Sequence, residues 1–435
     1  MKKKIVSVLL AGVMALMVMS CGGSQGKDVA DNGNEPAAEE TEASAKNEEA
    51  DSSAKEAADE DKDKGDDFRI GIVTGSYSQS EDDRRGAEAF QEKYGMGSVT
   101  LAIYPDNFTE ELDTTIQTIV NLAEDPKMKA IVVNQAVDGT TEAFRRIHEI
   151  RPDIICIAGE AYEDFSDIEK TADLVVNCDF VNRGYLIIRT AHELGCDTFV
   201  HISFPRHLSY ETVARRVAIM KAACEEFDMK FVMEEAPDPT TDVGVPGAQA
   251  YILEHVPEWV EKYGENSAYF CTNDAHTEPL IKKLLECGGY FIEADLPSPM
   301  MGYPGALDLD LTGESGDFEK ILKKVESAVV NKGGAGRFGT WTYSYGYTVS
   351  AGLAEHARNV ILGQSSLNSI DDLSKAYGVF SPGVKWNGSV YTEAGTGERS
   401  DNTILIYQDT YIFGDPGHYM GTAEVVVPEK YFTIE

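Results

Sequence analysis

The chain has 435 residues, of which 74 are acidic and 38 are Lys or Arg, so its formal net charge at pH 7 is −36. A protein this acidic repels phosphate groups at long range, which argues against nucleic acid and anionic lipid surfaces as partners of its folded part. Beyond residue 67 the chain is still long enough for two ordinary domains with cores of their own.

The start of the chain has the pattern of a bacterial export signal. Three lysines precede an apolar run over residues 5–19, which is too short to span a membrane as a helix. The run ends in VMSC, which resembles the lipobox of bacterial lipoproteins, with Cys21 as its last residue. The resemblance implies that residues 1–20 are a signal peptide and that Cys21 is lipidated. The alternative is an ordinary cleaved signal with a chance cysteine.

A polar, acidic segment follows over residues 22–67. It consists almost wholly of Asp, Glu, Ala, Ser, Lys, Asn and Gly, and Val29 is its only large aliphatic residue. Such a segment cannot bury enough apolar surface to offset its ordering entropy, so we expect residues 21–67 to be a lipidated cysteine and a disordered linker. As a flexible coil it would span roughly 40 Å, and its like charges extend it further. An acidic interaction tail is the alternative.

The chemistry-bearing residue types show no catalytic or metal-binding pattern. Six cysteines remain after Cys21, none of them in a C-x-x-C pair. Cys156, Cys178 and Cys271 lie in apolar runs, where free cysteine behaves as a small buried hydrophobic residue. H-E-x-x-H, P-loop and G-x-S-x-G motifs are absent, and the eight histidines show no spacing that places three ligands on one element. We therefore expect no catalytic residue, no metal and no cofactor.

From residue 69 onward, short apolar runs alternate with longer amphipathic stretches. Strands and helices that alternate in this way form right-handed βαβ crossovers and parallel sheets covered on both faces. Two sheets fit better than one, because polar residues interrupt the rhythm after the fifth run. An aromatic strand is expected within residues 337–347, and late strands over 402–414 and 423–435 that cap a sheet edge. The nine runs are 69–75, 98–104, 130–135, 153–159, 173–178, 198–204, 230–236, 268–273 and 290–296.

The order of these elements resembles the type I periplasmic binding protein fold, the two-lobed receptor family of bacterial solute importers. The resemblance is carried by RIGIVTG and its polar loop, the crossover VVNCDFVNRGYLIIRTA, the junction CTNDAHTEPLIKKLL and the late helix SAGLAEHARNVILG. More narrowly, the chain resembles an uncharacterised clostridial-type group of solute-binding lipoproteins. The implied fold class is α/β, with two Rossmann-like lobes of parallel sheet joined by a hinge. The implied first lobe is 68–179 plus about 312–435, and the second is 180–311.

Candidate ligand-binding residues follow the strands, because open α/β sheets bind ligands at the carboxyl ends of their strands. Polar groups there can hydrogen-bond hydroxyls, amines or ring nitrogens, and aromatic rings can stack on a flat ligand. The first-lobe candidates are Ser76, Tyr77, Gln79, Glu81, Asn134, Gln135, Glu160 and Asp179, and the others are Phe204, Arg206, Asn273, Asp274, Asp295 and Trp341.

Several candidates have a competing structural role. In related receptors the acidic residue of the Asn-Asp pair often holds ligand hydroxyls, which the resemblance carries over to Asp274; a helix cap is its alternative role. Arg206 could clamp an anionic group or pair with a surface acid. Asp179 could face the ligand or form hydrogen bonds at the hinge. Trp341 is the one residue of its aromatic run that we expect to reach the cleft.

The function that these observations predict is that of a lipid-anchored, extracytoplasmic solute-binding protein. It would capture a small polar or aromatic ligand in an interlobe cleft and deliver it to the permease of an ABC importer. Its partners would then be the ligand, the permease and, through the lipid anchor, the cell membrane, but no nucleic acid. Two alternatives remain: a ligand-sensing surface receptor for a signalling partner, which would have the same fold, and a surface enzyme.

Overall fold

The structure, a computed structural model, describes residues 67–435. The predicted signal peptide, the lipidation of Cys21 and all but the last residue of the predicted linker lie outside the described residues. Within the described part, no helix has both the length and the apolar character needed to cross a membrane.

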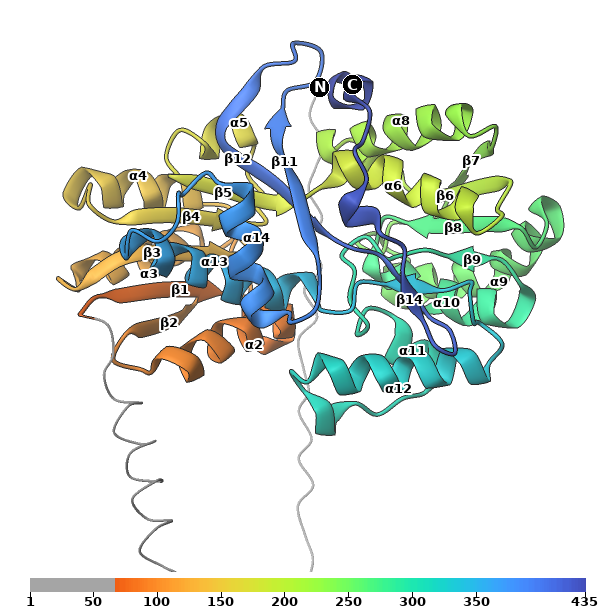
Figure 1. Ribbon diagram of the computed structural model, residues 1–435, viewed down its shortest axis with the longest axis horizontal. Helices are drawn as coiled ribbons and strands as arrows, with labels where there is room; N and C mark the ends of the chain where they lie inside the picture. Colours follow the sequence, from red (N-terminus) through yellow and green to blue (C-terminus); the bar gives the residue numbers. More distant parts are fainter. Residues whose placement is uncertain (1–66) are drawn as a thin grey trace, which may run out of the picture. The chain divides into compact units, whose positions relative to one another are not determined.

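Seven strands form the first sheet, in the order β11-β12-β5-β4-β3-β1-β2 (Figure 1). The pairs from β2 to β12 are parallel, whereas β11 runs antiparallel to β12. The central strands are buried on both faces, which explains their near-continuous apolar sequences. The strands are β1 (Arg69–Thr74), β2 (Val99–Ile103), β3 (Met128–Asn134), β4 (Ile155–Gly159), β5 (Leu174–Cys178), β11 (Trp386–Thr392) and β12 (Arg399–Gln408).

Helices cover the first sheet, and one of them comes from late in the chain. Helix α13 contacts β1, β3 and β4 and packs between α2 and α14. The late strand β12 pairs with β5, so residues far apart in sequence complete one sheet. The helices are α2 (Tyr77–Tyr94), α3 (Leu112–Val120), α4 (Thr140–Ile150), α5 (Phe165–Ile168), α13 (Tyr345–Ile361) and α14 (Ile370–Phe380), with the 3-10 turn η1 (Asn121–Glu124).

The second sheet has four parallel strands in the order β7-β6-β8-β9, drawn in green in Figure 1. Its strands are β6 (Thr198–Ser203), β7 (Lys230–Glu235), β8 (Ser267–Cys271) and β9 (Tyr290–Phe291). Its helices are α6 (Phe180–Glu193), α7 (Pro205–Leu208), α8 (Glu211–Glu226), α9 (Gly244–Tyr263), α10 (Asp274–Cys287), α11 (Tyr303–Leu307) and α12 (Phe318–Asn331), with η2 (Thr312–Glu314). Two sheets, rather than one of nine strands, are therefore confirmed.

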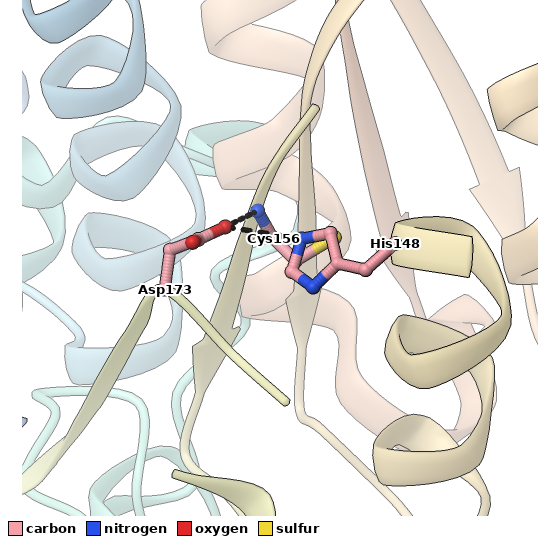
Figure 2. Close-up of side chains that lie close together, drawn as sticks. All are labelled: His148, Cys156 and Asp173. Atoms are coloured by element: carbon pink, nitrogen blue, oxygen red, sulfur yellow. Dashed lines mark hydrogen bonds and ion pairs between the residues drawn. The ribbon is translucent and has the colours of Figure 1, made fainter. Parts of the chain in front are cut away.

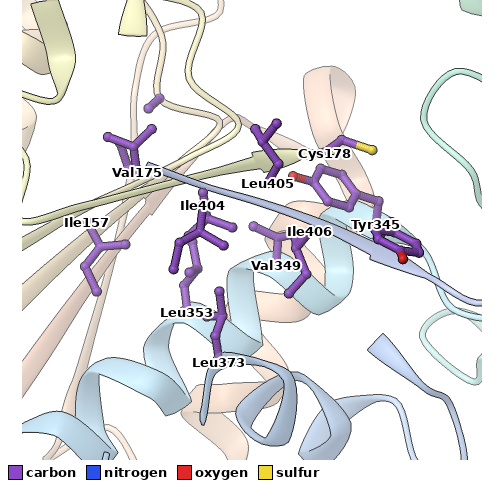
Figure 3. Packing of buried hydrophobic residues seen from close by; sticks show 14 of the residues in the cluster. Ile157, Val175, Cys178, Tyr345, Val349, Leu353, Leu373, Ile404, Leu405 and Ile406 are labelled. Atoms are coloured by element: carbon purple, nitrogen blue, oxygen red, sulfur yellow. The ribbon is translucent and has the colours of Figure 1, made fainter. Parts of the chain in front are cut away.

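Two clusters of buried side chains hold these layers together. The larger one surrounds the first sheet, where Ile404 and Leu405 of β12 pack near Val175 of β5 (Figure 3). The smaller one fills the far side of the second sheet. Helix α12 belongs to the smaller cluster, because its apolar face buries Phe318 and Val325 there. This helix falls within the stretch that the resemblance places in the first lobe.

Two local predictions were wrong. The aromatic run expected as a strand forms only the two-residue β10 (Gly339–Thr340), and helix α13 begins at Tyr345 within the run. The last predicted strand is replaced by the 3-10 turns η3 (Thr422–Glu424) and η4 (Glu429–Thr433), and Pro428 lies between them. Proline cannot donate to a strand ladder, which explains the break. A small antiparallel sheet joins β10 to β13 (Tyr411–Ile412) and β14 (His418–Tyr419).

Candidate functional site

The loops at the carboxyl ends of the parallel strands of the two sheets contact each other through side chains. We call these two sets of loops together the shared edge. The first sheet contributes the residues that follow β1, β3 and β4, and the second contributes those that follow β6, β8 and β9. Ser298, beyond β9, donates its hydroxyl to Asp82 of α2 over 3.4 Å. Because all these strands are parallel within their sheets, the loops that bind ligands in such folds meet here.

Arg183, in the first turn of α6, is the buried link between that helix and the residues that follow β9. Its guanidinium donates to Glu293 Oε1 at 2.7 Å and to the carbonyls of Ala294 and Asp295, both at 2.8 Å. The side chains of Arg183 and Glu293 are only 3% and 1% exposed. A buried arginine with this many acceptors is held in one position, so the residues after β9 are fixed to the start of α6.

Trp341 packs against this link instead of reaching a ligand. Its side chain is fully buried, and its indole nitrogen donates to Glu293 Oε2 at 3.0 Å. The Arg183 guanidinium carbon lies 5.1 Å from the centre of the Trp341 ring, within cation–π range. The prediction that Trp341 reaches the cleft is therefore corrected: its one polar atom is already used inside the core.

Asp274 is a sequence-predicted residue whose surroundings change its acidity. The helix cap is Asn273, whose Oδ1 accepts from the Ala275 amide at 3.0 Å, so the alternative role for Asp274 as cap is not used. Asp274 reaches solvent. Even so, the protein around it withholds water from its carboxyl and, together with the charge of Asp295, raises its pKa to about 6. An acid that is accessible and yet crowded in this way lies in a concave part of the surface.

Tyr162, which follows β4, is a residue of the first sheet whose pKa is affected by Asp274 of the second. The tyrosine is 53% exposed, and its hydroxyl donates to Gln135 Oε1. Its pKa is raised by partial burial first, and then by the charges of Glu160, Asp83 and Asp274. Because Asp274 belongs to the second sheet, this effect places the Tyr162 phenol and the Asp274 carboxyl within electrostatic reach of each other.

Glu160 and Asp295 add two further acceptors. Glu160 is partly exposed and accepts from the Cys178 amide through Oε2 at 3.0 Å; burial raises its pKa. Asp295, 22% exposed, forms an ion pair with Arg216 of α8. Together with Asp274 these groups make the shared edge rich in hydrogen-bond acceptors, which suits ligands that bear hydroxyl or amino groups.

Other predicted residues are buried or form hydrogen bonds and ion pairs within the protein. Asn134 is 1% exposed and donates to Asp83 Oδ1 at 2.6 Å. Asp179 is fully buried and caps α6 by accepting from the Asn182 amide at 2.7 Å, which is its predicted alternative role. Phe204 is 1% exposed. Arg206 pairs with Asp238 at 2.6 and 2.9 Å, which is likewise its predicted alternative.

The loop after β1 turns into helix α2 almost at once. Ser76 donates to Asp106 Oδ1 at 2.7 Å, and the half-exposed Tyr77 donates to Glu88 Oε1 at 2.5 Å. Glu81 is exposed and pairs with Arg85. Gln79 lies in α2, and its side chain is outside what the structure describes. These contacts hold the polar groups along α2.

Sequence reasoning missed Asp82 and Asp83 of α2, and it missed Tyr162. Asp83 is 4% exposed, and burial followed by the charge of Asp82 raises its pKa to about 7. Tyr104, which follows β2, is 3% exposed and contacts Phe108 edge-on at 5.9 Å. The missed acids directly follow Glu81, the last residue that was considered in that loop. Tyr162 lies two residues beyond Glu160, so a longer window after each strand would have included it.

A separate surface hollow of about 590 Å³ lies away from the strand ends. It lies between α2, the loop before α12 and the start of α13, and none of the predicted ligand residues lines it. Its lining includes Arg85, Glu88 and Asp317, together with Phe318 and Tyr347. Arg85 already pairs with Glu88 within α2. The chemistry of the shared edge makes it the stronger candidate for ligand binding.

Comparison with known proteins identifies relatives without an assigned activity. A family model described as "Protein of unknown function (DUF3798)" matches residues 68–339, and a second model without a description matches residues 350–434. An uncharacterised protein of Treponema pallidum (strain Nichols) is 41% identical over 209 residues, which cover 48% of this chain and 94% of that protein. A second one from the same organism is 38% identical over 180 residues, covering 40% of this chain and 81% of that protein.

A solved crystal structure matches the fold, and a second one is less similar. The crystal structure of a protein from Clostridium difficile 630, described as a proposed transcriptional regulator, has a TM-score of 0.71 and 23% identity, covering 80% of this chain and 99% of that one. A periplasmic solute-binding protein of an ABC transporter from Actinobacillus succinogenes 130z, with bound D-allose, has a TM-score of 0.44 and 15% identity, covering 69% and 93%. The described part has the two-lobed α/β fold of the type I periplasmic binding proteins, as the sequence predicted.

Proposed function

The chain belongs to the DUF3798 family, and from the shared edge we propose that it is a solute-binding protein that captures a small polar or aromatic ligand between its two lobes. The observation that carries the proposal is the electrostatic effect of Asp274 on Tyr162. The two residues follow strands of different sheets, both reach solvent, and the charge of Asp274 is one of the causes that raise the pKa of Tyr162. A ligand that sits there exchanges water for an aromatic face on one side and carboxylate acceptors on the other.

The proposed mechanism is closure of the lobes around the ligand. The chain passes between the sheets at the start of α6, where Arg183 and Asp179 are both buried and hydrogen-bonded. We place the hinge there, with residues 68–179 and about 312–435 as one lobe and 180–311 as the other, except for α12, which packs with the second core. Closure requires only that the ligand binds the closed state more tightly than the open one.

We further propose that the protein works outside the cytoplasm on a lipid tether and hands its ligand to an ABC importer. Support for this comes from the export-signal pattern, from Cys21 at the end of the VMSC motif and from the acidic segment that follows. A ligand-sensing receptor that presents the same closed form to a signalling partner is the second candidate. We expect no enzymatic turnover, since the acids of the shared edge are not arranged around a nucleophile.

A thermal-shift screen of the full chain tests the proposal. The probes are sugars, nucleosides, amino acids, vitamins and short peptides, each over a range of concentrations. A ligand that binds only the folded state raises stability by about 2.7 kcal/mol at a hundred times its Kd. The melting temperature should therefore rise with the concentration of at least one class. If none of these classes shifts it, the solute-binding proposal fails.

A pair of substitutions on one helix then locates the site. Asp274→Asn leaves the Asn273 cap intact and removes one carboxylate from the shared edge. Glu286→Gln, further along α10, changes an exposed acid that pairs with Lys283. We expect the first variant to weaken binding by roughly tenfold or more, because a hydrogen bond to a charged group contributes about 1.5–3 kcal/mol. The second should bind as the wild type does; equal affinities for all three proteins would place the site elsewhere.

A further inference from the structure

Three different metal-binding side chains lie together at the amino ends of β4 and β5, at the opposite end of these strands from the shared edge. They belong to His148, Cys156 and Asp173. The imidazole nitrogen, the thiol sulfur and a carboxylate oxygen all lie within 4.8 Å of one another. His148 belongs to the last turn of α4, Cys156 is the second residue of β4, and Asp173 immediately precedes β5. Figure 2 shows the three side chains turned toward one another from these elements.

From this geometry we propose that these three residues form a binding site for a borderline divalent transition-metal ion, Zn²⁺ foremost, with the fourth position left to water. Nitrogen, sulfur and carboxylate oxygen are the donors that zinc takes in proteins. With metal–ligand bonds of about 2.0–2.3 Å, a tetrahedral site separates its ligand atoms by about 3.3–3.8 Å, so the present spacing closes with side-chain movements of roughly 1 Å.

The burial gradient gives the ion a route to the site. The side chains of His148 and Asp173 are 28% and 39% exposed, whereas Cys156 is fully buried. An incoming ion therefore meets the imidazole and the carboxylate first and the sulfur last. The two exposed ligands have the freedom to adjust, while β4 holds the sulfur in place.

Charge balance favours a divalent ion at this depth. Burial, and then the charge of Asp173, raises the pKa of the Cys156 thiol well above its usual range. When the ion binds, the thiol proton leaves to water and the sulfur becomes a thiolate. One thiolate and one carboxylate then neutralise the two positive charges, which removes the cost of burying an isolated anion.

The contacts already present compete with the metal but do not block it. His148 Nε2 lies 3.3 Å from Asp173 Oδ2 and 3.1 Å from the Ile154 carbonyl. Asp173 Oδ2 also accepts from the Cys156 amide at 2.8 Å. If His148 binds through Nε2, its proton moves to Nδ1 through solvent and the Ile154 contact is given up. Asp173 has two carboxylate oxygens, so one can bind the ion while the other accepts from the backbone amide.

Cobalt titration of the full chain tests the site, because a cobalt–thiolate bond absorbs in the near ultraviolet. After treatment with a chelator and its removal, the wild type should develop this band up to one Co²⁺ per chain, and Zn²⁺ should displace it. Each bound ion should release one proton, so binding should tighten as pH rises. Absence of the band at saturating Co²⁺ would overturn the proposal.

Variants that keep the existing hydrogen bonds separate metal binding from folding. Asp173→Asn still accepts from the Cys156 amide, and His148→Gln still donates to the Ile154 carbonyl, yet each should weaken Co²⁺ binding by more than about tenfold. Cys156→Ser should abolish the band, while Cys196→Ser, at another buried free cysteine, should retain it. A band that survives Cys156→Ser would refute the assignment. Because the cluster lies at the amino ends of β4 and β5, neither result bears on ligand binding at the shared edge.

Discussion

Replacing Arg183 with Met should lower the free energy of unfolding by about 3–5 kcal/mol, because it leaves a buried carboxylate without its charged partner. The guanidinium donates to Glu293 and to two backbone carbonyls after β9, and both ends of the ion pair are at most 3% exposed. Methionine fills much of the same volume, so the loss comes from the charge and the hydrogen bonds.

Urea denaturation followed by circular dichroism measures this loss, with Arg189→Gln as the matched control. Arg189 lies on the same helix, α6, and forms an exposed ion pair with Glu193 at 2.7 Å. Exposed pairs of this kind contribute only about 0.3–0.5 kcal/mol. The structure therefore predicts losses about tenfold apart for two arginines six positions from each other.

A double-mutant cycle with Glu293→Gln checks the cause. If the carboxylate is what Arg183 stabilises, the coupling energy between the two substitutions should exceed about 1 kcal/mol. A loss for Arg183→Met no greater than that for Arg189→Gln, or additive effects in the cycle, would refute the assignment of Arg183 as the link between α6 and the residues after β9.

Three further predictions concern stability. Gly352→Ala in α13 should destabilise the folded protein, because the added methyl group would lie 2.3 Å from a ring carbon of Tyr377 in α14. Gly378→Ala has open space around it and should stabilise the protein by up to about 1 kcal/mol; thermal melts compare the two variants. Asp83 has a folded pKa of about 7 against 3.8 for a free carboxyl, so its contribution to stability is full below pH 3.8 and is lost as pH rises through 7. A wild-type stability that does not fall relative to Asp83→Asn over this range would contradict it. Ile406→Ala should lower the free energy of unfolding by about 2–5 kcal/mol, whereas Val426→Ala, at a 90% exposed residue, should barely change it. Equal denaturation midpoints for the two variants would count against β12 as a core strand.

The strands of the first sheet were predictable because burial on both faces leaves a strong local pattern. The run at 130–135 opens with four apolar residues, and β3 is buried along its length apart from Lys129. For the residues late in the chain, the local sequence pattern predicted secondary structure less well. The alternating aromatics around Trp341 and Tyr345 suggest a strand, but the helix that starts at Tyr345 buries the second of them against the first sheet. Packing with distant strands overrides local periodicity there.

In the candidate site, too, the local sequence predicted some features and the packing of distant elements decided others. Asn273 and Asp274 were found from sequence, since a polar pair after a strand is a local feature. Which of them caps α10 and which remains accessible depended on the backbone geometry of that helix turn. The partner of Asp274, Tyr162, comes from the other sheet, and no local signal links residues so far apart.

The sequence by itself determined the α/β class, the use of two sheets and the loops that carry polar groups, because each of these follows from the spacing of apolar and polar residues along the chain. Only the tertiary structure decided which distant residues meet. It buried Trp341 against Arg183, joined the late strand β12 to β5, and gathered His148, Cys156 and Asp173 from three elements. Contacts between elements depend on how sheets and helices pack in three dimensions, and that arrangement leaves no regular trace in residue spacing.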